Sequence, residues 1–263
     1  MSLGFSVDAL LPRARAGGPL RMGLVRLEER EWLDPAPDVA ARAAGFAEWP
    51  QGVQLTGEVE APGRELAAML GVTGGLPEAA RAVHEDLCLL TQREGEEVYR
   101  LIGAAVAWPS DWRPAEKLGL PLRALHAPIA GYEEQLASGV DRFMATLRPG
   151  TIYGRCNWFI APTGARRWLA EGPAAQAFAH VTRDNAGETL FVRSERQTLR
   201  RLPQTGAILF AIGIYVEPLG RLSPANVARL AGAVETLLGG EDARRGAPAY
   251  AESLIAYAER IAA

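Results

Sequence analysis

Strict alternation of apolar residues marks one strand in this sequence. Between residues 208 and 216 every second position carries a large apolar side chain, namely Ile208, Phe210, Ile212, Ile214 and Val216. A period of two is typical of a half-buried strand. The segment Pro203–Gly206 is a plausible tight turn. We therefore predict a β-hairpin whose first arm lies just before this turn.

The first arm of the hairpin is unusually polar. Phe191, Arg193, Glu195 and Gln197 share one face, whereas Leu190, Val192, Arg196 and Thr198 share the other. One interpretation is an edge strand with a solvated, charged face. The other is a polar cavity wall, in which an arginine and a glutamate pair with each other or with a charged ligand. The small residues of the second arm, such as Ala211 and Gly213, fit either a nearby ligand or a packed helix.

The rest of the chain contains segments with helical and with strand periodicity. Helical spacing appears at 62–70, 76–91 and 250–261, in several turns between 114 and 147, and from Ser223-Pro224 onward. Strands are predicted at 53–59, 98–108 and 152–160. The first fifty residues suggest an irregular lead-in with short helical pieces. Because strands and helices are segregated along the chain, we predict an α+β fold with an antiparallel sheet.

Length and charge limit the classes of protein that remain. We predict a single domain over residues 1–263, with an N-terminal lead-in to about residue 75 and a C-terminal helical extension over about 220–263. The net charge is -3 and no basic stripe is present, which argues against nucleic-acid binding. No run approaches the ~20 apolar residues that span a bilayer, and no signal peptide is recognisable, so we expect a cytoplasmic protein without a membrane partner.

Few residues in the sequence carry obvious chemistry. Nucleotide-binding glycine fingerprints, phosphate loops and nucleophile elbows are absent from the sequence. The two cysteines make neither a disulfide framework nor a zinc site. His84 and Cys88 would lie one turn apart on a predicted helix, where they could bind a metal or could be a surface histidine and a core cysteine. His126, between an apolar turn and Pro128, could be a haem ligand or a structural residue.

Five segments of the sequence resemble one known family. They are VHEDLCLL (83–90), WPSDWRPAEKLGLPLRALHAPIAGY (108–132), VDRF (140–143), RCNWFI (155–160) and RSERQTLRRLPQTGAILFAIGIYVEPL (193–219). In this order they are similar to the haem-dependent oxidative N-demethylase α-subunit family, over about residues 79–219. The resemblance implies a PAS-like haem-binding fold, an antiparallel β-sheet with helices packed on one face, extended here by additional N- and C-terminal helices.

The resemblance also implies an activity and its cofactors. Family members oxidise dimethylamine with O2 and NADPH-derived electrons, and produce formaldehyde and the demethylated amine. We therefore expect a haem monooxygenase that binds haem b and acts on a small secondary amine. FMN and a 2Fe-2S cluster are expected on partner reductase subunits and not on this chain.

Site residues follow from the matched positions only. The resemblance implies that His126 is the axial iron ligand and that Arg155 or Arg196 pairs with a haem propionate. Catalytic roles fall to Glu195, which would orient that arginine or face an ammonium substrate, and to Asn157, which would donate to a polar distal ligand. Further residues expected at the cofactor are Gln197, Trp158 and Tyr215, of which Trp158 is expected to pack.

Four positions depart from the family pattern. Gly213 stands where the family has arginine, His84 where it has glutamine, Ala130 where it has proline, and Cys156 where it has a small hydroxyl residue. His84 and Cys156 are rival iron ligands, and a thiolate ligand would change the iron chemistry. Two alternatives to the enzyme remain open: a non-catalytic haem-binding PAS-like sensor of gas or redox state, and a folded relative without a cofactor.

Overall fold

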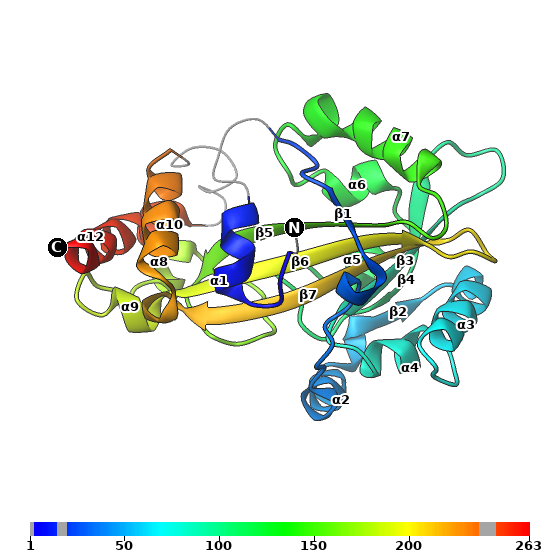
Figure 1. Cartoon of the computed structure of the whole chain (residues 1–263), viewed down its shortest axis with the longest axis horizontal. Helices are drawn as coiled ribbons and strands as arrows, with labels where there is room; N and C mark the ends of the chain where they lie inside the picture. The colour runs from blue at the N-terminus through cyan, green and yellow to red at the C-terminus, as the bar shows by residue number, and fades with distance from the viewer. Residues whose placement is uncertain (1–2, 15–19, 237–245) are drawn as a thin grey trace. The chain divides into compact units, whose positions relative to one another are not determined.

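The computed structural model describes residues 3–14, 20–236 and 246–263, and it confirms an α+β fold built on an open antiparallel sheet (Figure 1). The strands of the sheet follow the order β1-β5-β6-β7-β3-β4-β2. They are β1 (Val25–Leu27), β2 (Val53–Leu55), β3 (Asp86–Gln92), β4 (Tyr99–Ala105), β5 (Ile152–Ala161), β6 (Phe191–Arg201) and β7 (Ile208–Pro218).

Helices precede, interrupt and follow the strands. The α-helices are α1 (Val7–Leu10), α2 (Val39–Glu48), α3 (Glu60–Met69), α4 (Leu76–Arg81), α5 (Pro114–Lys117), α6 (Leu122–His126), α7 (Ser138–Thr146), α8 (Ala174–Ala177), α9 (Ala186–Thr189), α10 (Pro224–Thr236) and α12 (Ala251–Ala262). Short 3-10 turns are η1 (Leu11–Arg13), η2 (Glu29–Glu31), η3 (Pro50–Gly52), η4 (Gly57–Val59), η6 (Leu219–Arg221) and η7 (Ala247–Ala249), and η5 (Glu133–Ala137) is a π-helix. Within the described ranges, none of these helices combines the length and the apolar character needed to cross a bilayer.

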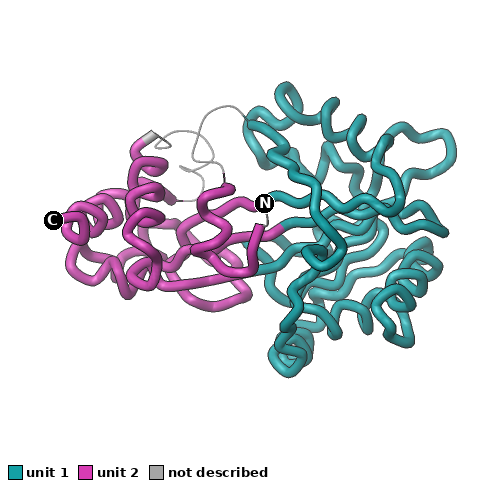
Figure 2. Tube along the Cα trace, in the orientation of Figure 1, with its two compact units in different colours: residues 1–2, 20–155, 197–214 teal, residues 3–19, 156–196, 215–263 magenta. Residues whose placement is uncertain are grey.

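The chain forms two compact units (Figure 2). The described part of unit 1 comprises residues 20–155 and 197–214, and that of unit 2 comprises residues 3–14, 156–196, 215–236 and 246–263. Strands β5, β6 and β7 contribute residues to both units. Each buried apolar cluster described below belongs to one unit.

In unit 1, helical segments cover both sides of the sheet. On one side, Leu122 of α6 and Met144 of α7 join a buried cluster with Leu90, Leu199 and Ile208 from the strands. On the other side, Gly103 of β4 faces η4 and α4. A Cβ on Gly103 would lie 2.4 Å from Val59 Cγ2 and 3.0 Å from Leu76 Cδ2, so a glycine is needed for this close approach.

In unit 2, the core lies between the strands and the C-terminal helices. Ile160 of β5 and Val192 of β6 are buried in one apolar cluster with Leu230 of α10 and Leu254 of α12. The amphipathic spacing predicted for the last two helices therefore reflects burial of one face of each helix.

The structure confirms the predicted hairpin and its turn. Strands β6 and β7 are joined at residues 202–207, where the Leu202 N–H donates to the Ala207 carbonyl at 2.8 Å. The Glu65 carboxylate accepts hydrogen bonds from the backbone N–H groups of Gln204 and Thr205, at 2.7 and 2.9 Å. The turn is thus held by a side chain distant in sequence as well as by its own backbone. Strands predicted at 98–108 and 152–160 are confirmed as β4 and β5.

The interpretation of the polar arm as an edge strand is wrong. Strand β6 lies between β5 and β7. Arg193, Ser194 and Arg196 are fully buried. The charged groups of Arg193 and Arg196 must therefore find their partners inside the protein and not in solvent.

Two predicted segments differ from the structure. The helix predicted over 76–91 ends at Arg81, and Asp86–Gln92 forms strand β3. Strand β3 lies inside the sheet between β4 and β7, and Leu87, Cys88, Leu89 and Leu90 are all buried. Neither face of this run is exposed, so it shows no strand alternation. Cys88 therefore lies within a strand, and it is not one helical turn from His84. The strand predicted over 53–59 ends at Leu55, where the chain turns into η4.

Candidate functional site

The structure distributes the expected site residues over the two units. Unit 1 contains His126, Arg155 and Gln197, and unit 2 contains Asn157, Trp158, Glu195, Arg196 and Tyr215. Strand alternation separates them further. Along β5, Arg155 and Asn157 project to the same side and Trp158 to the other. Along β6, Glu195 and Gln197 project to the same side and Arg196 to the other.

Backbone pairing to a strand positions His126. Pro121 forms a bridge with Arg100 of β4, and helix α6 begins at the next residue. Leu122, the first residue of the helix, is buried. His126 is the last residue of α6, and its Nδ1 lies 2.8 Å from the Leu122 carbonyl oxygen. Because a carbonyl only accepts, Nδ1 carries the proton and Nε2 keeps its lone pair. This is the arrangement that metal-binding histidines commonly show.

The surroundings of His126 keep its ring neutral. Burial lowers the pKa of His126, and this effect exceeds the opposing effect of the hydrogen bond to Leu122. The positive charges of Arg155 and Lys117 lower the pKa further. A neutral imidazole is the form that binds a metal ion.

Apolar side chains of unit 1 surround the helix that carries His126. Leu125 packs against two buried clusters, one of which contains Cys88, Leu101, Ala104 and Val106. Three further apolar side chains lie partly exposed at the edge of that cluster: Trp49, Trp112 and Phe210. Burial raises the pKa of the Cys88 thiol, so this side chain is a neutral, apolar member of the cluster.

These residues of unit 1 fit a haem in their chemistry. A haem site needs an axial ligand, apolar contact with the macrocycle and a partner for the propionates. His126 supplies a neutral imidazole with an available Nε2, and Leu125 leads into an apolar surface with partly exposed aromatic rings. Arg155, whose charge acts on His126, supplies a guanidinium of the kind that pairs with carboxylates.

Asn157 and Glu195 form a hydrogen-bonded pair in unit 2. Asn157 Nδ2 donates to Glu195 Oε2 at 3.0 Å. Asn157 Oδ1 is buried and has no hydrogen-bond partner among the described residues. Glu195 is partly exposed. The amide thus fixes one carboxylate oxygen of a side chain that solvent can still reach.

Arg196, Trp158 and Tyr215 make packing contacts within unit 2. Arg196 Nε donates to the Gly4 carbonyl at 3.1 Å, and its guanidinium lies 4.3 Å from the centre of the Phe5 ring. The fully buried Arg196 therefore holds the N-terminal segment through charge-assisted and cation–π contacts. Trp158 and Tyr215 pack against the buried cluster of unit 2.

The two rival ligands are engaged by backbone carbonyls. His84 is buried, and its Nε2 lies 3.0 Å from the Ile214 carbonyl oxygen in unit 1. Cys156 is buried, and its Sγ donates to the Leu10 carbonyl at 3.3 Å in unit 2. In the described part of the chain, no group of three or more His, Cys, Asp or Glu side chains could hold a metal ion.

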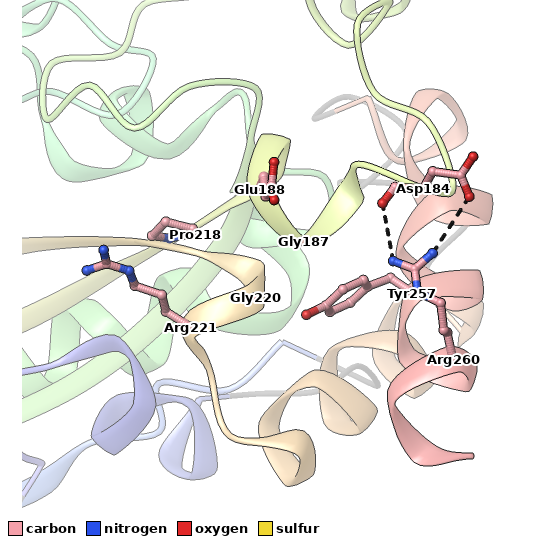
Figure 3. Close-up of a pocket in the computed structure, with 8 residues that line it drawn as sticks. All are labelled: Asp184, Gly187, Glu188, Pro218, Gly220, Arg221, Tyr257 and Arg260. Atoms are coloured by element: carbon pink, nitrogen blue, oxygen red, sulfur yellow. Dashed lines mark hydrogen bonds and ion pairs between the residues drawn. The ribbon is translucent and has the colours of Figure 1, made fainter.

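Sequence reasoning did not find two pockets. In unit 2, a cavity of about 410 Å³ lies between α9, η6 and α12 (Figure 3). The Tyr257 ring approaches the backbone closely there, since a Cβ on Gly187 would lie 2.6 Å from it. Arg260 donates to the Arg183 and Asp184 carbonyls at 2.9 and 3.3 Å. These contacts attach α12 to the rest of unit 2, and none of the expected site residues lines this cavity.

The second pocket lies beside His126 in unit 1. It has a volume of about 290 Å³, and its lining includes Arg123, His126, Tyr132, Glu133 and Glu134. This volume is at the lower end of the ~300–1,000 Å³ typical of small-molecule pockets. Its lining is mixed, since it also includes Ala127, Ile129, Ala130 and Gly131.

Comparison with family models identifies a family for this chain. A family model described as "Haem-dependent oxidative N-demethylase, alpha subunit-like" matches residues 60–253, which is more than half of the chain. The matched range includes His126, Arg155, Asn157 and Glu195.

Proposed function

The chain belongs to the haem-dependent oxidative N-demethylase, alpha subunit-like family, and from this membership we propose that it binds haem b through His126. The observation that supports this ligand is the 2.8 Å contact between His126 Nδ1 and the Leu122 carbonyl oxygen, which leaves Nε2 free to bind iron. The side chain of Arg155 pairs with a propionate, and the apolar surface around Leu125 excludes water from the macrocycle.

The proposed reaction is oxidation of an N-methyl group of a small secondary amine such as dimethylamine. Haem, when bound, supplies the activation of O2 with electrons that come from NADPH. The methyl carbon gains a hydroxyl, the second oxygen atom leaves as water, and the carbinolamine then breaks its C–N bond to give formaldehyde and the demethylated amine. Glu195, oriented by Asn157, accepts a hydrogen bond from the ammonium form of the amine.

The electron donors are expected on other chains. The family description names an alpha subunit, which implies an enzyme of several subunits. We propose that partner reductase subunits carry FMN and a 2Fe-2S cluster. The sensor alternative differs in one respect only, since it binds haem and gas without turnover.

Absorption spectra of the haem-loaded protein test the haem site. Spectra are recorded in the oxidised, reduced and CO-bound states for the native chain, for His126→Ala and for His180→Ala. His180 is exposed and serves as the matched control. We expect a saturable Soret band in the native chain and the control, and its loss or a large shift in His126→Ala. A native chain without saturable haem binding would refute the proposal.

Turnover assays then separate the enzyme from the sensor. With a reductase partner, the enzyme consumes NADPH and releases formaldehyde only when an amine is present. Glu195→Gln keeps the size of the side chain and removes its charge, so we expect a raised KM for the amine with an unchanged Soret band. Haem and CO binding without amine-dependent turnover would favour the sensor.

A further inference from the structure

The imidazole of His126 is stacked on a second ring. The rings of His126 and Tyr132 have centroids 4.4 Å apart and planes only 8° from parallel. Tyr132 is 4% exposed, so its ring is fixed inside unit 1. Neither sequence periodicity nor the family roles assigned above give Tyr132 a function.

A compact turn brings Tyr132 back over His126. The Ile129 N–H donates to the His126 carbonyl at 2.9 Å, and the Tyr132 N–H donates to the Ile129 carbonyl at 3.1 Å. Gly131 adopts a left-handed conformation with φ of 76°, which a residue with a side chain rarely tolerates. Two successive turns and this glycine therefore determine where the Tyr132 ring lies.

The segment after Tyr132 fixes the turn in place. The π-helix η5 begins at Glu133, and π-helical turns occur frequently at functional sites. Gln135 in this segment accepts a hydrogen bond from the Leu20 N–H through Oε1 at 2.8 Å. A Cβ on Gly131 would lie 2.5 Å from Gln135 Nε2, so the turn and the π-helix are closely packed.

The imidazole is thus held in two independent ways. The hydrogen bond from Nδ1 to the Leu122 carbonyl fixes the edge of the ring, and the stack on Tyr132 fixes its plane. Rotation of the ring about its Cβ–Cγ bond would break both contacts. The ring orientation and the tautomer that leaves Nε2 available are therefore coupled to Tyr132.

We propose that Tyr132 is a positioning residue for His126: its ring holds the imidazole in the plane and tautomer in which Nε2 can bind iron. The proposal rests on the proposed function for the identity of the metal group. Residues that orient a ligating histidine typically change metal affinity about 10–100-fold when they are removed.

The stack requires the Tyr132 ring and not its hydroxyl. The hydroxyl oxygen is buried and has no hydrogen-bond partner among the described residues. Tyr132→Phe therefore keeps the stack, and Tyr132→Leu removes it. Phe143→Leu is the matched control, because Phe143 makes an edge-to-face contact with Tyr153 in the same unit, with centroids 5.3 Å apart.

Haem loss to an excess of apomyoglobin is the first measurement. We expect Tyr132→Leu to release haem about tenfold faster than the native chain, and Tyr132→Phe to restore the native rate. The reduction potential and the Soret maximum should change in Tyr132→Leu and remain native in Tyr132→Phe and in Phe143→Leu. Native behaviour of Tyr132→Leu in all three measurements would overturn the proposal.

NMR of the haem-free protein separates this proposal from the proposed function. Imidazole ¹⁵N shifts report which nitrogen carries the proton, and ring-current shifts of the imidazole protons report the stack. If the native chain binds no haem, the proposed function fails, and loss of the Nδ1–H signature in Tyr132→Leu still supports the positioning role. An unchanged imidazole in Tyr132→Leu overturns the positioning role whether or not haem binds.

Discussion

Two buried polar regions of unit 1 differ in how completely their hydrogen bonds are made. In the first, Arg42 of α2 pairs with Asp86 of β3 at 2.8 Å, and its Nε and Nη2 groups donate to the Ala80 and Glu85 carbonyls. Asp86 also accepts from the Ala107 and Trp108 N–H groups. The Arg42 guanidinium lies 4.5 Å from the centre of the Trp108 ring. Both charges are therefore fully paired.

The second region, around His126 and Tyr132, keeps unused hydrogen-bonding capacity. The Tyr132 hydroxyl and Asp141 Oδ1 are buried without a partner among the described residues. His126 Nε2 is left with its lone pair. Fully paired buried charges hold a fold together, whereas buried groups with spare capacity carry a cost that a ligand could relieve. A ligand is therefore expected in the second region and not at the buried ion pair of the first.

Removing the ion pair of the first region should have the largest effect on stability. Asp86→Ala leaves the Arg42 charge buried and without its carboxylate, so we expect the free energy of unfolding to fall by about 3–5 kcal/mol. Urea denaturation measures this change. Glu60→Ala is the control, because it removes an exposed partner of Arg64 and should cost less than about 0.5 kcal/mol.

A double variant tests whether the pair serves only the fold. Arg42→Met with Asp86→Leu replaces both charges by apolar side chains of similar size, and it should be more stable than Asp86→Ala alone. If the double variant is as unstable as the single one, the pair contributes more than mutual neutralisation. The first region could then no longer be contrasted with the second as a pair of charges that serves only the fold.

The sequence predicted a strand whose large apolar residues alternate with mostly small ones better than a strand formed by an unbroken apolar run. The alternation of Ile208, Phe210 and Ile212 gave β7 correctly, together with the turn before it. The run Leu87–Leu90 has no period of two because all four side chains are buried, and such an apolar run is equally compatible with a helix. The contact of Asp86 with Arg42, 44 positions earlier, leaves no local pattern in the sequence.

The sequence identifies candidate site residues but not the groups that contact them. His126 was singled out by its apolar neighbours and Pro128, and the structure adds the tautomer through the Leu122 carbonyl. Alternation along β6 implies that Glu195 and Arg196 project to opposite sides. Only the structure shows that Gly4 and Phe5 cover Arg196, because contacts with a distant segment leave no local pattern. Tyr132 was missed because its stack depends on the φ of Gly131.

A variant of Gly131 tests how much the left-handed turn in the second region contributes to stability. Gly131→Ala places a side chain in the left-handed conformation, and we expect it to lower the free energy of unfolding by about 1–2 kcal/mol. Gly139→Ala is the matched control, because Gly139 lies in α7 with open space around its Cβ position. Removing a helical glycine should stabilise by about 0.5–1 kcal/mol. Opposite signs in urea denaturation confirm the prediction, and equal effects contradict it.

The pH dependence of stability gives a smaller effect in the same region. The pKa of His126 is lowered by burial from 6.5, so the folded state binds fewer protons than the unfolded state near this pH. The free energy of unfolding should therefore fall as the pH decreases from 7 through 6.5. His126→Gln removes this contribution, and the curves of the two proteins should separate over this interval. Parallel curves would mean that His126 titrates equally in both states.

Of these variants, Tyr132→Phe should change the free energy of unfolding least. The sign of the change shows whether the Tyr132 hydroxyl has a hydrogen-bond partner in solution. Burial, followed by the charge of Asp141, raises the pKa of Tyr132 to about 12, so the hydroxyl stays a neutral donor across the accessible pH range. A buried donor without a partner carries a desolvation cost of about 1–3 kcal/mol. Removing it should leave the free energy of unfolding unchanged or slightly raised, as urea denaturation can show. A clear loss of stability would mean that the hydroxyl has a partner in solution, such as Asp141 Oδ1. The second region would then be as fully paired as the first, and its spare capacity would be confined to His126 Nε2.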